Sequence, residues 1–153
     1  MVIFTYIKAK RHIDEQKKII VSGNLRELGR VLDFVEENLC QACFDREFIT
    51  TVKFMTDELF SNIAMYAYED KEGEAAVILN IIEGEGVELT FMDAGIPYNP
   101  LNQPEPDILL PVEERTEGGL GIYLVRTMAD KMEYKYADGK NVLKVWKKSG
   151  KED

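Results

Sequence analysis

Residues 56–68 read T-D-E-L-F-S-N-I-A-M-Y-A-Y and close a long helical pattern. Apolar side chains recur at helical spacing along it, at Phe48, Val52, Met55, Leu59 and Tyr66. Asn62 falls on the same stripe, and Glu58 precedes it by one turn, so both polar side chains leave one flank of the helix. Each needs a partner, because an unsatisfied buried polar group costs about 1–3 kcal/mol. The rest of the fold can supply that partner, and so can a ligand such as a metal ion.

The composition predicts one cytoplasmic domain. The 153 residues are 45% hydrophobic and 31% charged, which is ordinary for a globular chain with its own core. A net charge of −9 without a basic block argues against a nucleic-acid partner. The N-terminus does not resemble a signal peptide, and no apolar run reaches the roughly 18 residues of a membrane span. We expect a domain over residues 1–148 and a charged tail over 149–153.

The two cysteines form a C-x-x-C motif at the end of a helical pattern. Redox motifs of this kind occur at strand-to-helix turns, so we expect Cys40 and Cys43 to be buried or half-buried thiols. With His12 as the only histidine, a structural zinc site lacks ligands of the usual type.

The N-terminal half predicts strands followed by two helices. Residues 2–7 and 18–21 are rich in β-forming side chains, and the polar residues 8–17 between them predict a loop. Residues 25–43 carry a helical stripe that follows the N-cap chemistry of Ser22, Gly23 and Asn24. A second stripe begins at Asp45, a candidate N-cap, and runs to about Tyr68. The first of these helices is expected to pack on a sheet.

A hairpin is predicted next. Residues 74–82 and 87–92 read as strands joined by the tight turn Gly84-Glu85-Gly86, which makes the pair antiparallel. Asp93 continues the phase of the apolar side chains of the second strand, so its carboxylate points toward the buried side. It either caps the turn D-A-G-I-P or presents an acceptor to a ligand amine.

Residues 98–118 hold four of the five prolines and little periodicity, which is typical of a lid, a binding loop or a disordered segment. The glycine-rich run T-E-G-G-L-G then opens a helix. The free N–H groups at such a helix start suit a phosphate, although the glycines can also serve only a tight turn. Residues 132–136 and 141–146 predict a closing hairpin.

This order of motifs, E-x-x-x-N on a helix, D-x-G after a hairpin, a variable loop and G-x-G opening a helix, resembles the GHKL or Bergerat nucleotide-binding domain. Gyrase, the heat-shock chaperone, histidine kinases and the mismatch-repair ATPase share that domain. The segments D-E-L-F-S-N-I-A-M-Y-A-Y and G-G-L-G-I-Y-L-V-R most resemble the corresponding motifs of the anti-sigma factor serine/threonine kinases. The resemblance implies an α+β two-layer sandwich whose mixed, mainly antiparallel sheet is covered on one face by three helices.

The resemblance also implies roles for single residues. Asn62 matches the asparagine that holds Mg²⁺ against the phosphates, and Glu58 matches the carboxylate that accepts a proton from the attacking hydroxyl. Asp93 matches the aspartate that binds the adenine amino group, and Gly95 lets the base approach the backbone. The backbone amides that meet the phosphates are matched by Gly119, Leu120 and Gly121.

Two positions depart from the family pattern. The first glycine box usually reads D-x-G-x-G, and Pro97 stands here in place of the second glycine, which removes a backbone donor. Family kinases commonly place an arginine before the G-G-L-G, where this chain has Glu117. Arg115 can take that catalytic role if the ATP lid, residues 98–118, folds suitably.

The resemblance therefore implies an ATP- and ADP-binding, Mg²⁺-dependent kinase. Its substrate is a serine or threonine of an anti-sigma antagonist, and its second partner is a sigma factor. A homodimer is expected from the resemblance alone. Pro97 and Glu117 favour an alternative, a nucleotide-responsive binding module without kinase activity. A structural domain without a nucleotide site is a third interpretation.

Overall fold

The computed structural model describes residues 15–105, 107, 109, 111 and 119–150. These residues form one five-stranded sheet in the order β1-β2-β3-β5-β4. Its strands are β1 (Glu15–Ser22), β2 (Glu74–Ile82), β3 (Gly86–Asp93), β4 (Lys131–Ala137) and β5 (Lys140–Lys148).

Every pair of neighbouring strands in the described sheet is antiparallel. The expectation of a mixed sheet is thus wrong for these strands, while the antiparallel hairpins are confirmed. For the pairs β2–β3 and β4–β5 the reason lies in the connections, because turns of three and two residues join them and parallel pairing needs a long crossover.

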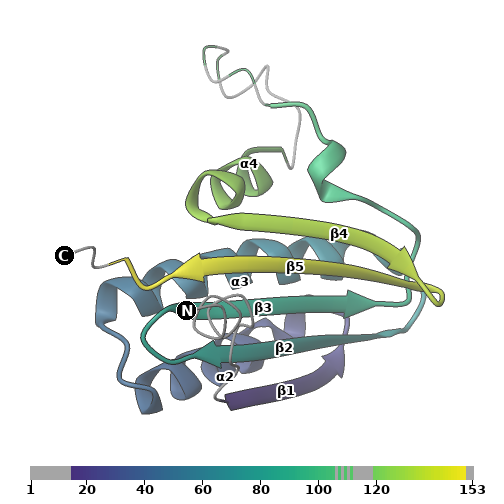
Figure 1. Ribbon diagram of the computed structural model, residues 1–153. Coiled ribbons are helices and arrows are strands. Elements are labelled where there is room, and N and C mark those ends of the chain that lie inside the picture. Colours follow the sequence, from purple (N-terminus) through teal and green to yellow (C-terminus); the bar gives the residue numbers. More distant parts are fainter. Residues whose placement is uncertain (1–14, 106, 108, 110, 112–118, 151–153) are drawn as a thin grey trace, which may run out of the picture.

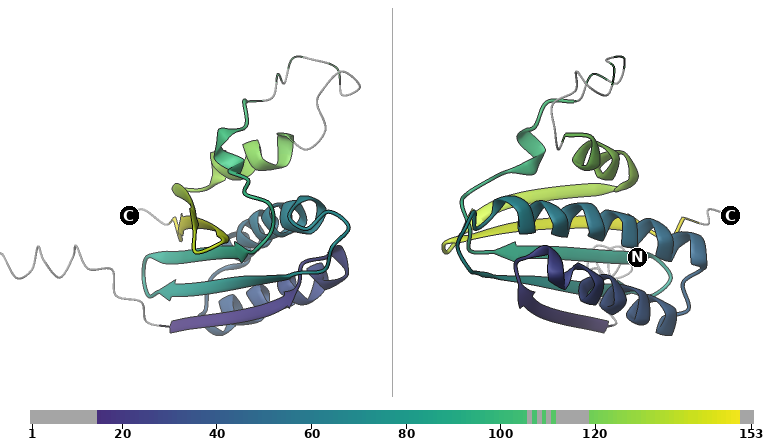
Figure 2. Two further views of the ribbon diagram at one scale, coloured as in Figure 1. Left: turned by 90° about the vertical axis from the view of Figure 1, so that its right-hand side faces the viewer. Right: turned by 180° about the vertical axis from the view of Figure 1, so that it is seen from behind.

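Two α-helices cover one face of this sheet. Figure 1 and the rear view in Figure 2 show α2 (Leu28–Gln41) and α3 (Arg46–Tyr66) lying side by side across it. The third helix, α4 (Gly119–Met128), packs against α3 near β4, and its Ile122 and Val125 join the same hydrophobic core. Two short 3-10 helices, η1 (Leu25–Glu27) and η2 (Pro100–Asn102), complete the described elements. The two-layer α+β sandwich is confirmed.

The central helix forms as its stripe predicts. Asp45 caps it, accepting a hydrogen bond of 2.8 Å from the backbone N–H of Phe48. The apolar side chains of this stripe are buried from Phe48 to Leu59. They form one hydrophobic core with buried side chains of the sheet. Tyr66 is an exception, because the last turn of α3 borders a pocket instead of the core, and this side chain is 47% exposed. No helix in the described ranges is long and apolar enough to cross a membrane.

Several local expectations need correction. Strand β1 begins at Glu15, so residues 15–17 are strand and not loop, since they pair with β2 in full register. Cys40 and Cys43 are exposed free thiols, because Cys40 lies off the buried stripe of α2, which is Val31, Val35 and Leu39, and Cys43 follows the end of that helix at Gln41. The predicted strand over residues 2–7 lies outside the described residues.

Candidate functional site

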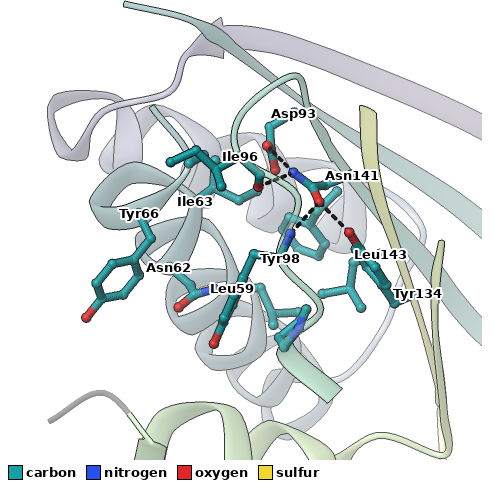
Figure 3. Close-up of a pocket in the computed structure, with 13 residues that line it drawn as sticks. Leu59, Asn62, Ile63, Tyr66, Asp93, Ile96, Tyr98, Tyr134, Asn141 and Leu143 are labelled. Carbon is teal, nitrogen blue, oxygen red and sulfur yellow. Dashed lines mark hydrogen bonds between the residues drawn. The ribbon is translucent and has the colours of Figure 1, made fainter. Parts of the chain in front are cut away.

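A pocket opens where the C-terminal part of α3 meets the ends of β3 and β5 (Figure 3). It holds about 450 Å³ of empty space, part of which is open to solvent. Asn62 of α3, Asp93 at the end of β3 and Asn141 at the start of β5 all contribute to its wall. Two of the residues singled out in the sequence, Asn62 and Asp93, therefore share one pocket.

Asp93 presents one carboxylate oxygen to the protein and leaves the other open. Its Oδ1 accepts a bond of 2.9 Å from the Gly95 backbone N–H and another of 2.9 Å from Asn141 Nδ2. Its Oδ2 has no hydrogen bond to any residue that the structure describes, although the side chain is only 7% exposed. An almost buried acceptor at a pocket wall is suited to a ligand that donates a hydrogen bond.

The residue that holds Asp93 in place, Asn141, was not identified from the sequence. It lies directly opposite Asp93 in the β3–β5 register. Its amide nitrogen donates to Asp93 and to the Ile96 carbonyl, and its Oδ1 accepts from the Tyr98 backbone N–H and the Tyr134 hydroxyl. Both donors and both lone pairs are used, so Asn141 supports the site without a free group for a ligand. The sequence pattern could have indicated this residue, because Asn141 lies on the same face of its strand as the buried apolar residues Leu143 and Val145.

The loop after β3, residues 94–98 (the β3 loop), rests on the end of α3. Ile96 donates its backbone N–H to the Ala67 carbonyl at 2.9 Å. A Cβ on Gly95 would lie 2.2 Å from that same carbonyl oxygen, so only glycine allows this approach. Pro97 has no N–H, but the amides on either side of it are already bonded, and it interrupts no hydrogen bond of the loop.

Asn62 faces the pocket without a partner. No hydrogen bond joins its side chain to the described part of the chain, and it is half-buried. Among the described residues no three His, Cys, Asp or Glu side chains are grouped to hold a metal ion. A lone amide oxygen fits Mg²⁺, which keeps most of its water and binds through few protein ligands together with substrate phosphates.

Glu58 lies one turn before Asn62 and meets the start of α4. A Cβ on Gly121 would lie 1.9 Å from Glu58 Oε2, so the glycine lets the two helices approach. Burial, with a smaller contribution from the neighbouring Asp57, raises the pKa of Glu58. A raised pKa brings this carboxyl closer to the range in which it can exchange a proton at neutral pH.

Comparison with known proteins places the chain in a family. The family described as the histidine kinase-like ATPase domain matches residues 21–147. The chain belongs to this family. It is also 31% identical over 99 residues to the serine-protein kinase RsbW of Bacillus thuringiensis strain Al Hakam, and 32% identical over 99 residues to RsbW of Bacillus cereus strain AH187. Each alignment covers 62% of this chain and 61% of the relative. The chain therefore spans about three fifths of the curated relatives that it matches.

Of the remaining motif residues, some lie among the described residues and some do not. Gly119, Leu120 and Gly121 form the first turn of α4, with Leu120 40% exposed. The backbone N–H groups of a first turn have no partner within the helix. Arg115 and Glu117 lie outside the described residues.

Proposed function

We propose that this chain is an ATP-dependent serine/threonine protein kinase of the anti-sigma factor type, which phosphorylates an anti-sigma antagonist and exchanges it for a sigma factor. The observation that carries the proposal is the open Oδ2 of Asp93 in the same pocket as the unpartnered Asn62. Glu58, one turn before Asn62 on α3, lies against Gly121 in the first turn of α4. The names of the RsbW relatives, serine-protein kinases, support the same activity.

In this proposal the nucleotide lies along α3. The adenine amino group donates to Asp93 Oδ2, with Gly95 beside the base. The phosphates reach the amides of Gly119, Leu120 and Gly121, where the positive end of the helix dipole favours them. Mg²⁺, when bound, would supply positive charge that offsets the negative charge developing on the phosphates. Asn62 is the residue that would hold it, and ADP occupies the same site after transfer.

Glu58 is proposed to act as the base. The hydroxyl oxygen of the substrate serine or threonine attacks the γ-phosphorus, and the bond from that phosphorus to the ADP oxygen breaks. The hydroxyl proton passes to the Glu58 carboxylate. Because such transfers depend mainly on positioning and electrostatics, little else is required of the protein. Arg115 is proposed to meet the γ-phosphate from the lid.

We further propose that residues 1–148 act as one cytoplasmic domain with a short tail, as a homodimer, without nucleic-acid or membrane partners. The net charge of −9 supports the exclusion of nucleic acid. Pro97 and Glu117 favour a second candidate, a nucleotide-responsive binding module without kinase chemistry. The two candidates share the nucleotide site and differ only in phosphoryl transfer to an antagonist protein.

Asn62→Ala tests the proposed role of Asn62 in holding Mg²⁺. We expect the wild type to bind ATP more tightly with Mg²⁺ than without it, and the variant to lose about tenfold in affinity only when Mg²⁺ is present. Isothermal titration calorimetry with and without Mg²⁺ measures both. Ser61→Ala is the matched control, since Ser61 precedes Asn62 on α3 and bonds to Asp57 instead. Equal Mg²⁺ dependence in Asn62→Ala and wild type would contradict the assignment.

A further inference from the structure

We propose that Tyr68 is a positioning residue for the adenine end of the site, acting through the β3 loop. The inference rests on the proposed nucleotide site. Tyr68 follows the end of α3 and contributes nothing to the pocket wall, whereas its neighbour Ala67 does. Its hydroxyl is nevertheless bonded to the segment that carries Asp93.

The hydroxyl of Tyr68 joins two strand ends. It accepts a hydrogen bond of 2.8 Å from the Ala94 backbone N–H, one residue after β3, and donates to the Glu74 carbonyl at the start of β2. A tyrosine hydroxyl is protonated at neutral pH and can therefore make both bonds, and burial raises the pKa of Tyr68 further. The Tyr68 hydroxyl accepts from the Ala94 amide and the Ala67 carbonyl accepts from the Ile96 amide, so the amides on both sides of Gly95 are bonded.

The ring of Tyr68 is held in a slot between two glycines. A Cβ on Gly73 would lie 2.1 Å from ring atom Cε1, and a Cβ on Gly23 would lie 2.9 Å from Cε2 on the other edge. A backbone hydrogen bond of 2.7 Å from Gly23 N to the Gly73 carbonyl closes the slot. The ring therefore has little freedom to move sideways, and its hydroxyl is a fixed anchor for the β3 loop.

This arrangement gives Tyr68 a defined effect on ligand binding. Asp93 Oδ1 accepts from the Gly95 N–H, which lies between the Ala94 and Ile96 amides that Tyr68 and Ala67 bind, so the orientation of the carboxylate depends on the loop. Releasing Ala94 loosens the loop at the adenine end while leaving Asn62 and Glu58 on α3 unaffected. Ligands that share the adenine base should lose affinity by a common factor.

Tyr68→Phe tests the inference because it keeps the ring in its slot and removes only the hydroxyl. We expect adenosine, ADP and ATP each to bind about fivefold more weakly, since a net hydrogen bond of this kind corresponds to such a factor. The gain in ATP affinity from Mg²⁺ should not change. Hydrogen exchange at the Ala94 amide should become faster. Tyr123→Phe on α4, whose hydroxyl has no hydrogen bond to the described residues, is the control for removing a tyrosine hydroxyl.

The outcomes separate the inference from the proposed function. If the wild type binds ATP and Tyr68→Phe changes only the melting temperature, the residue is merely structural and the inference is overturned. Unequal losses among the three ligands would also overturn it. If the wild type binds no nucleotide, the proposed function fails first, and the role of Tyr68 with it. Gly73→Ala displaces the ring but keeps the hydroxyl, and it should reproduce the common loss.

Discussion

Asp93→Asn is expected to weaken ATP and ADP binding by about 100-fold or more, because a polar site that meets the wrong hydrogen-bonding partner loses far more than a single contact. The carboxylate Oδ1 accepts from both Gly95 N and Asn141 Nδ2. An asparagine must place its only oxygen there, which turns its NH₂ group toward the pocket. That donor then faces the adenine amino group, which is also a donor. Titration calorimetry in the presence of Mg²⁺ measures the loss.

A base with an oxygen in place of the amino group distinguishes this explanation from unfolding. ITP carries such an oxygen, so Asp93→Asn should lose its preference for ATP over ITP even as ATP binding falls. Asp70→Asn, a change of the same kind at an exposed residue beyond α3, should leave both ligands unaffected. If Asp93→Asn binds ATP as the wild type does, Asp93 does not contact the base.

Glu58→Gln is expected to lower phosphoryl transfer by about 100-fold or more, the usual contribution of a general base, with ATP affinity changed by less than about twofold. The amide keeps the size of the side chain against Gly121 but cannot accept the hydroxyl proton. Transfer of labelled phosphate from ATP to a purified anti-sigma antagonist measures the rate. Glu47→Gln, a change of the same kind at an exposed residue in the first turn of α3, is the matched control and should retain the rate. Wild-type activity in Glu58→Gln would exclude it as the base.

The stability of the same variant shows whether lost activity reflects chemistry. Burial raises the pKa of Glu58 above its ordinary value of 4.5, so the fold favours the protonated form. That favourable contribution is present below pH 4.5 and is lost as the pH rises through the folded pKa. Glu58→Gln should therefore melt at the same or a higher temperature than wild type at pH 7, with the difference vanishing near pH 4. A lower melting temperature at pH 7 would contradict this.

The sequence predicted the elements whose signals are local. The cap at Asp45 and the stripe through Leu59 specify α3, and the turn Gly84-Glu85-Gly86 specifies the β2–β3 hairpin. Asp93 followed from the two-residue period of its strand, and the structure buries it as the phase requires. Asn62 and Asp93 were linked only by the resemblance to a known family, and the fold brings them to one pocket.

The contacts that the sequence did not predict depend on residues far apart in the chain. Asn141 bonds to Asp93 across 48 positions, and Tyr68 bonds to Ala94 across 26. Neither pairing has a local pattern, because strand order and loop position are set by the whole sheet. The exposed thiols of Cys40 and Cys43 have the same origin, since the end of a helical pattern does not reveal which face of it the core covers.

The most direct measurement is a titration of isotope-labelled protein with ADP and Mg²⁺, followed by NMR. We expect the backbone amides of Gly95 and Gly121 and the side-chain amide of Asn141 to shift together with one dissociation constant. The indole of Trp146, the single tryptophan, lies five residues beyond Asn141 along β5 and should not shift. Saturating ADP that leaves Gly95, Asn141 and Gly121 unmoved, or shifts Trp146 alone, would contradict a nucleotide site between Asp93 and α4.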